Sequence, residues 1–311
     1  MCSVLKLELK KAFKNKFFWI SVVLGCLITL LSFEHMVNMY YEGMSAISGN
    51  STDIIYDPHI GINTVFNCWI GGEPFSLGSS IYFFVFPLLI ALPYGWSYSE
   101  ERKCGYRRMM ITKTGKKKYY CAKYVAVFLS GGVAMVLPLI FNFWMTLLVV
   151  PAILPDVTMN MFYGVFGGSF LAELYYTVPF LYVAIYLFID FVYCGFLVCI
   201  CMAVSGIVRQ KWGVVLIPFL LLLFVHVITD YIYSDPSVAY KELSPLYFLR
   251  GVEVRYSFSG SIILLFAIGL LVISLIGIIK EYHVIFFRYL LQLLVFLSCI
   301  EELRYGEQKW H

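Results

Sequence analysis

The sequence predicts an all-α, polytopic membrane protein with six transmembrane helices and an N-terminal interfacial amphipathic helix. Of its 311 residues, 61% are hydrophobic and only 14% are charged, whereas soluble domains have about 45–50% apolar and about 25% charged residues. Several uncharged stretches are also long enough to cross about 30 Å of hydrocarbon as helices. A soluble globule of this composition would expose large apolar patches. The composition therefore argues against a soluble enzyme and against a nucleic-acid partner.

Residues 1–16 are predicted to form a cytoplasmic interfacial helix, because apolar residues share one helical face and lysines cover the other. The apolar face holds Leu5, Leu9, Ala12 and Phe13, and the lysines are Lys6, Lys10, Lys11 and Lys14. An ordinary juxtamembrane anchor without a fixed shape is the alternative interpretation.

Long apolar segments then predict six spans within a transmembrane domain at 17–280. Barrel strands would alternate polar and apolar residues, whereas these segments are apolar all round, which favours helices. Arg288 interrupts the apolar tail, so residues 281–311 are expected to form either an interfacial helix or a seventh span. The expected spans are residues 17–33, 78–98, 124–150, 177–207, 213–232 and 259–279.

The distribution of lysine and arginine predicts the orientation in the cell membrane. Cytoplasmic loops carry an excess of these residues. With a cytoplasmic N-terminus and six spans, only Lys241, Arg250 and Arg255 fall outside. Of the nine cysteines, Cys68 alone falls outside, so no disulfide framework is expected.

The most informative segment is the basic loop at 99–123. Gly105 and Gly115 punctuate it, and between them Tyr106–Thr112 is expected to form a short helix that offers Met109, Met110 and Ile111 for contacts. A solvated loop whose lysines only fix the topology is the alternative. The sequence lacks a Walker A loop and the H-E-x-x-H and G-x-S-x-G motifs. We therefore predict no catalytic residue, cofactor or metal ion in this chain.

Several short motifs resemble those of permeases of the type-2 ABC exporter family. The second span ends in Glu101-Arg102-Lys103-Cys104-Gly105, similar to the family's glutamate-arginine-x-x-glycine pattern, and Lys123 stands where the family has a lysine opening the third span. Near the N-terminus, Glu8 stands at the family's acidic position. Leu243–Tyr247 resembles its short proline motif outside the last span.

This resemblance implies half of an ATP-driven exporter. A second permease subunit, identical or related, would complete the path, and separate cytoplasmic ATPase subunits would bind the loop at 99–123. The substrate would be a peptide, a lipid or a drug-like molecule, and membrane lipids would surround the spans. The implied coupling residues are Glu100, Glu101, Arg102, Gly105, Arg107, Arg108, Met109 and Met110.

Ionisable residues within the expected spans are candidates for contacts inside the membrane, where such groups are costly. Asp190 is either a substrate or proton contact or a helix-packing acid. His226 and Asp230 are spaced i, i+4 and share a face, which predicts a hydrogen-bonded pair. Two other functions stay open: a non-transport membrane sensor or immunity protein, and an intramembrane hydrolase that would depend on Asp190 or His226.

Overall fold

The computed structural model describes residues 2–49, 63–155, 165, 169–206, 208, 210–232, 241–253 and 255–280. The expected C-terminal interfacial helix or seventh span at 281–311 lies outside the described residues. Within the described part, the chain is helical, and its β structure is limited to an isolated bridge between Lys241 and Ser257. Five helices are long and apolar enough to cross a membrane: α2 (Lys16–Gly49), α7 (Lys116–Leu147), α9 (Pro179–Val204), α10 (Lys211–Ile232) and a helix at Gly260–Lys280.

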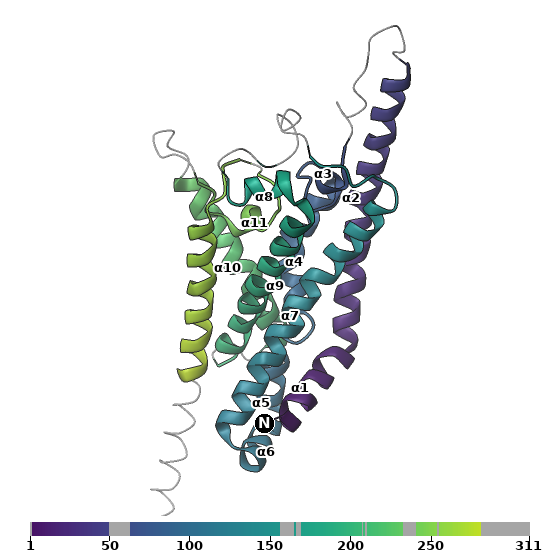
Figure 1. Cartoon of the computed structure of the whole chain (residues 1–311). Helices are drawn as coiled ribbons and strands as arrows, with labels where there is room; N and C mark the ends of the chain where they lie inside the picture. Colours follow the sequence, from purple (N-terminus) through teal and green to yellow (C-terminus); the bar gives the residue numbers. More distant parts are fainter. Residues whose placement is uncertain are drawn as a thin grey trace, which may run out of the picture.

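Shorter helices gather at the two ends of this bundle (Figure 1). At one end, which we name the α1 end, lie α1 (Cys2–Lys14), α5 (Ser97–Lys103) and α6 (Tyr106–Thr114). At the other, the α11 end, lie α3 (Val65–Cys68), α8 (Ala172–Thr177) and α11 (Pro245–Phe248). Helix α4 (Leu77–Ala91) runs between the two ends.

Three expected spans differ from the observed helices. The first was expected at 17–33, but α2 continues past Glu34, which set the expected boundary, to Gly49. The second was expected as one helix at 78–98, but α4 ends at Ala91, a turn follows, and α5 begins at Ser97. The prediction of a continuous second span was therefore wrong. The third was expected at 124–150, but α7 begins at Lys116, inside the loop expected at 99–123, and ends at Leu147.

Pro93 explains the break between α4 and α5. Proline has no N–H to donate, and its ring clashes with the carbonyl four residues earlier, here that of Leu89. The Ser21 hydroxyl of α2 donates to the Leu89 carbonyl at 2.6 Å, so the freed acceptor is satisfied by a neighbouring helix. The Asn15 amide, between α1 and α2, donates to the Pro93 carbonyl at 2.8 Å. The break between α1 and α2 and the break between α4 and α5 therefore stabilise each other.

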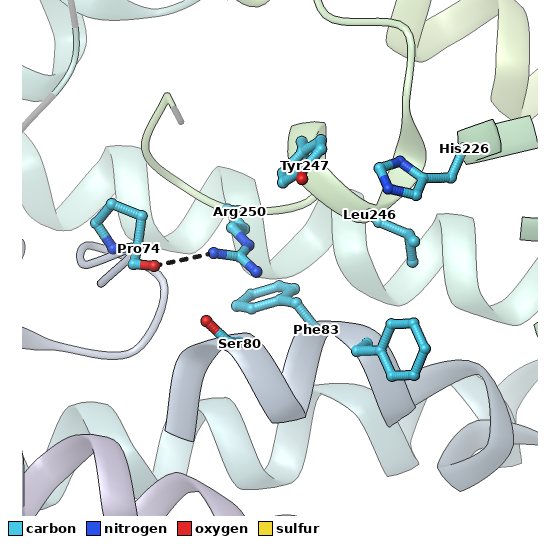
Figure 2. A pocket seen from close by; sticks show the side chains of 8 residues that line it. Pro74, Ser80, Phe83, His226, Leu246, Tyr247 and Arg250 are labelled. Carbon is cyan, nitrogen blue, oxygen red and sulfur yellow. Dashed lines mark hydrogen bonds between the residues drawn. The ribbon is translucent and has the colours of Figure 1, made fainter. Parts of the chain in front are cut away.

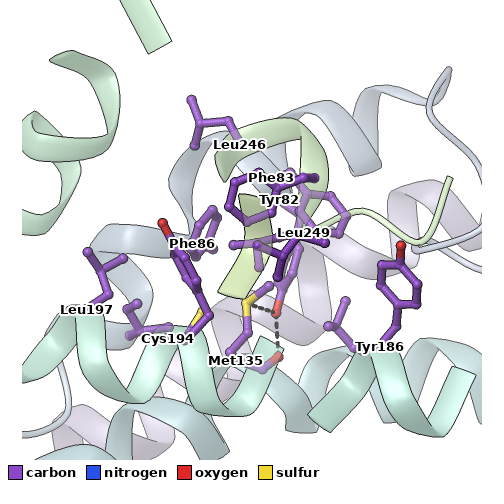
Figure 3. Packing of buried hydrophobic residues seen from close by; sticks show 14 of the residues in the cluster. Tyr82, Phe83, Phe86, Met135, Tyr186, Cys194, Leu197, Leu246 and Leu249 are labelled. Carbon is purple, nitrogen blue, oxygen red and sulfur yellow. Dashed lines mark hydrogen bonds between the residues drawn. The ribbon is translucent and has the colours of Figure 1, made fainter. Parts of the chain in front are cut away.

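Helix α7 packs between α2 and α9 at the centre of the bundle. Glycines allow the close approach of α7 and α9: a Cβ at Gly131 would lie 2.7 Å from Val198, and one at Gly195 would lie 2.5 Å from Phe128. Figure 3 shows the packed core beside them, where the Tyr82 hydroxyl donates to the Met135 carbonyl at 2.7 Å.

The outer faces of the long helices carry exposed large apolar side chains. In water such a surface would drive aggregation, whereas in a bilayer it is the surface that contacts lipid tails. This pattern agrees with the composition and supports a membrane-embedded bundle. Representative exposed residues are Trp19, Leu27, Phe188, Phe224 and Leu265.

Candidate functional site

A buried network of charges joins three helices at the α1 end. Its centre is Lys123 in α7, whose Nζ lies 3.0 Å from Oε2 of Glu8 in α1 and 2.9 Å from Oε1 of Glu101 in α5. The same Nζ donates to the Tyr94 hydroxyl at 3.0 Å. The side chains of Lys123 and Glu8 have no exposed surface. A buried cation of this kind needs several partners, and Lys123 has three.

Further partners complete the network around both carboxylates. The Tyr94 hydroxyl donates to Glu8 at 2.8 Å, and the Tyr119 hydroxyl donates to Glu101 at 2.6 Å. Lys11 of α1 lies 3.3 Å from each carboxylate. Two ammonium groups therefore face two carboxylates, and the formal charges of this set cancel.

The electrostatics of this network favour the charged forms of Glu8 and Lys11. Burial raises the pKa of Glu8, but attraction to Lys123 and hydrogen bonds from Tyr94 and Lys123 outweigh it and leave the pKa below its ordinary value. Burial lowers the pKa of Lys11, but a hydrogen bond with Tyr106 and attraction to Glu101 and Glu8 raise it overall. Helices α1, α5 and α7 are thus joined by charge-assisted hydrogen bonds.

Helix α6 lies directly against this network. Gly105 and Gly115 bound the helix with φ values of 72° and 84°, in the region that favours glycine. The inner face of α6 carries Met110 and Ile111, which are buried. They belong to an apolar cluster with Val4, Tyr98, Tyr119, Tyr120, Ala122 and Met202.

The opposite face of α6 is exposed and carries Arg108, Met109, Thr112 and Lys113, which we name the α6 outer face. It combines positive charge with an apolar thioether that is 46% exposed. The expected short helix is therefore present. The expectation that Met109, Met110 and Ile111 would all be available for contacts is wrong for the last two, because they pack inside the chain.

Arg102 ties this end to the rest of the bundle, and Arg107 ties α6 to α5. Nη1 of Arg102 donates to the carbonyls of Ser205 and Gly206 at 3.1 and 2.7 Å, at the C-terminal end of α9. Such carbonyls have no partner within their own helix, and they attract cations. Arg107 donates to the Tyr98 hydroxyl at 2.9 Å. Glu100 is half-buried in α5 and precedes Glu101, the network residue, in the sequence.

The candidate polar residues of the spans occupy two other places. Asp190 is buried in α9, and its Oδ1 has no hydrogen-bond partner among the described residues. His226 and Asp230 lie close together, with Nε2 and Oδ2 3.5 Å apart, whereas the hydrogen bond of His226 is between its Nδ1 and the Ser244 hydroxyl at 3.0 Å. Arg255 lies 2.7 Å from Asp230. Neither place is in contact with the network at Lys123.

Sequence reasoning missed part of the network. Tyr94 and Tyr119 carry no motif, and tyrosine near a span end is common in any membrane protein. Glu8 falls on the inner stripe of α1 with Val4 and Ala12, all three buried at i, i+4 spacing. That spacing was the available signal, since an acid between two small apolar residues faces a neighbouring helix.

No described group of three or more histidine, cysteine or acidic side chains is arranged to hold a metal ion. A search of protein families found none that matches this chain, and a search of curated proteins found no match either. The candidate site therefore stands on its own geometry.

Proposed function

We propose that this chain is the transmembrane permease subunit of an ATP-driven exporter in the cell membrane. Separate cytoplasmic ATPase subunits would hydrolyse ATP, and a second permease subunit, identical or related, would complete the substrate path. In this proposal the N-terminus is cytoplasmic, and the exported substrate is a peptide, a lipid or a drug-like molecule.

The proposal includes six membrane crossings, with α4 and α5 together forming the second. At about 1.5 Å per residue, the 15 residues of α4 reach about 22 Å, short of the hydrocarbon thickness. The turn and α5 supply the remainder, and interrupted spans are tolerated where neighbours satisfy the backbone. Ser21 and Asn15 do so here. Both chain ends would then be cytoplasmic unless 281–311 crosses again.

The observation that carries the proposal is the connection between the α6 outer face and the long helices. A protein that binds this face and moves would displace α6, whose inner face is packed against α1 and α7 residues. The ion network at Lys123 passes the displacement to α1, α5 and α7, and Arg102 passes it to α9. A chain without its own ATP motif can in this way respond to ATP hydrolysed elsewhere.

A test begins with a candidate ATPase encoded beside this chain, co-expressed and purified with it through a tag on the permease. We expect the two to co-purify and the complex to hydrolyse ATP. Met109→Asp with Lys113→Glu should abolish co-purification, because the double change reverses the charge and removes the apolar contact. Lys10→Glu, exposed in α1 outside the loop at 99–123, is the matched control.

Undiminished assembly of the double variant would contradict the role of the α6 outer face. The same preparation separates the other two functions. A sensor or immunity protein would bind its peptide without an ATPase, and an intramembrane hydrolase would lose activity on neutralising Asp190 or His226 with no ATPase present.

A further inference from the structure

A cavity of about 350 Å³ lies at the α11 end, far from the network at Lys123. Three parts of the chain line it: the start of α4, the last turns of α10, and α11 with the turn that follows. The lining residues are Pro74, Ser80, Phe83, Phe84, His226, Leu246, Tyr247 and Arg250. Figure 2 shows Arg250 above Phe83, with Pro74 on one side and Leu246 and His226 on the other.

Arg250 is the buried cation of this cavity, with 7% of its surface exposed. One Nη1 donates to the Pro74 carbonyl at 3.3 Å, and the guanidinium carbon lies 5.1 Å from the centre of the Phe83 ring. The Nε group is buried and has no acceptor among the described residues. None of the described carboxylates forms an ion pair with Arg250, although the buried Glu73, the residue before Pro74, attracts it electrostatically. A buried guanidinium normally has an anionic partner at hydrogen-bonding distance, and among the described residues Arg250 has only the Pro74 carbonyl as a hydrogen-bond acceptor.

Besides Arg250, the cavity has the polar groups of Ser80, His226 and Tyr247 and one apolar wall, and this wall reaches the exposed apolar surface of the bundle. Phe83 and Leu246 are buried, whereas Phe84 is 46% exposed. The Phe84 ring packs edge-on against Phe219 of α10 at 5.3 Å. Phe224 on the same helix is exposed. The cavity therefore borders the apolar outer face of α4 and α10, through which a chain from the membrane can enter sideways.

These features select one kind of ligand. A small water-soluble anion would pair with Arg250 but leave the apolar wall without a partner. A neutral lipid would cover the apolar wall but leave the guanidinium of Arg250 without an anionic partner. A molecule with an anionic head group and an apolar chain satisfies both, because carboxylates and phosphates pair with guanidinium in a bidentate manner.

We propose that this cavity binds one anionic amphiphile from the membrane, with its phosphate or carboxylate on Arg250 and its chain along Phe84. The site does not depend on the proposed export function: it holds equally for a resident lipid and for a transported one. A membrane phospholipid and a free fatty acid share this chemistry, and they are separated by the experiment.

Native mass spectrometry of the full chain in neutral detergent tests the proposal. Phosphatidylglycerol, phosphatidylcholine and oleate are added in turn. We expect one phosphatidylglycerol or one oleate to bind per chain, and the anion that binds tighter identifies the source. Phosphatidylcholine, whose head group has no net charge, should bind at least about tenfold more weakly.

Arg250→Gln should reduce binding of the anionic probe about tenfold or more. Lys241→Gln, which removes an exposed cation at the same end, should leave it unchanged. Ser80→Trp keeps Arg250 but fills the cavity, so it should also prevent binding. It replaces Arg250→Gln as the test variant if Arg250→Gln does not fold.

Three results would overturn the proposal. One is equal binding of phosphatidylcholine and both anions. Another is an equal loss in the Arg250 and Lys241 variants, which would mean general attraction to positive charge. The third is unchanged binding after Ser80→Trp, which would place the lipid elsewhere.

Discussion

Lys123 and Arg250 are both buried cations, yet their surroundings differ. Lys123 has two carboxylates and a tyrosine hydroxyl within 3.0 Å. Arg250 has a single carbonyl at 3.3 Å, aromatic rings and a cavity. The first cation is saturated by the chain itself, whereas the second is left incomplete. The burial of a charged side chain alone therefore does not indicate its role. The number of its hydrogen-bond and ion-pair partners does.

The difference supports the two proposals, which give the two ends of the bundle different tasks. A complete network holds α1, α5 and α7 in one arrangement and leaves no coordination for a ligand. A buried cation without an anionic partner stabilises its surroundings less, and it can still bind an anionic ligand. The α1 end is therefore suited to transmitting a displacement, and the α11 end to binding a molecule.

The largest effect is expected from Lys123→Met. The change leaves Glu8 and Glu101 facing each other without their shared cation, and breaking a buried ion pair on one side costs about 3–5 kcal/mol. Thermal unfolding of the purified protein in detergent measures the loss. Lys118→Met, at an exposed position on the same helix, is the control and should change little.

A double variant sharpens this result. If Glu8 and Lys123 act as a pair, Lys123→Met combined with Glu8→Gln should cost less than the sum of the two single changes. If the two losses in stability simply add, Glu8 and Lys123 stabilise the fold independently. That result would contradict the interpretation of the network as one unit.

Glu8→Gln should have a smaller effect that depends on pH. The pKa of Glu8 is lowered in the folded chain, so its stabilising contribution is complete above its ordinary value of 4.5 and is lost as the pH falls through the folded pKa. At pH 7 we expect a loss of about 2 kcal/mol, typical of hydrogen bonds to a charged group. The gap between the unfolding midpoints of variant and wild type should narrow below pH 4.5.

Glu73 at the α11 end should titrate with the opposite sign. Burial raises its pKa, although hydrogen bonds from Ser32 and Ser76 oppose the shift. Its ionisation therefore costs the folded chain stability as the pH rises from 4.5 through the folded pKa. Wild type should lose stability relative to Glu73→Gln over that window. If the stability contributions of Glu8 and Glu73 changed with pH in the same direction, the two ends would not differ electrostatically as described.

Much of the fold was predictable because composition and uncharged runs follow directly from the bilayer as solvent. Five of the six expected spans correspond to long apolar helices. The second did not, although Pro93 was visible in the sequence. A proline in a span can bend or break it, and the outcome depends on which neighbours satisfy the freed carbonyl. Ser21 and Asn15, more than seventy residues earlier in the chain, decide it here.

The two charged sites were predictable to different degrees. Glu101 and Lys123 stood out through the motifs of the resembled family, and His226 and Asp230 through their spacing. The cavity at Arg250 left no such signal, because Ser80, His226 and Arg250 are remote in sequence and their meeting depends on how α4, α10 and α11 pack. In the sequence, a lone arginine between two spans cannot be distinguished from a solvated one until its burial is known.

Gly105→Ala tests whether the backbone, in addition to the ion network, fixes the α1 end. A Cβ at this position meets nothing within 4 Å, so the cost comes only from the φ of 72°. That conformation costs a non-glycine residue about 1–2 kcal/mol. Gly43→Ala, within α2 and equally free of contacts, should instead stabilise by about 0.5–1 kcal/mol. Similar unfolding midpoints for the two variants would mean that the turn into α6 relaxes freely.

The smallest effect is expected from Arg250→Met in lipid-free neutral detergent. The variant loses one long hydrogen bond to Pro74, but it also removes a buried guanidinium whose Nε has no described acceptor. We expect these terms to offset within about 1 kcal/mol. Added phosphatidylglycerol should then raise the unfolding midpoint of wild type and not that of the variant, because only a ligand of the folded state stabilises it. A loss as large as that of Lys123→Met, before any lipid is added, would mean that Arg250 already has a strong partner in the chain, and the contrast between the two cations would fail.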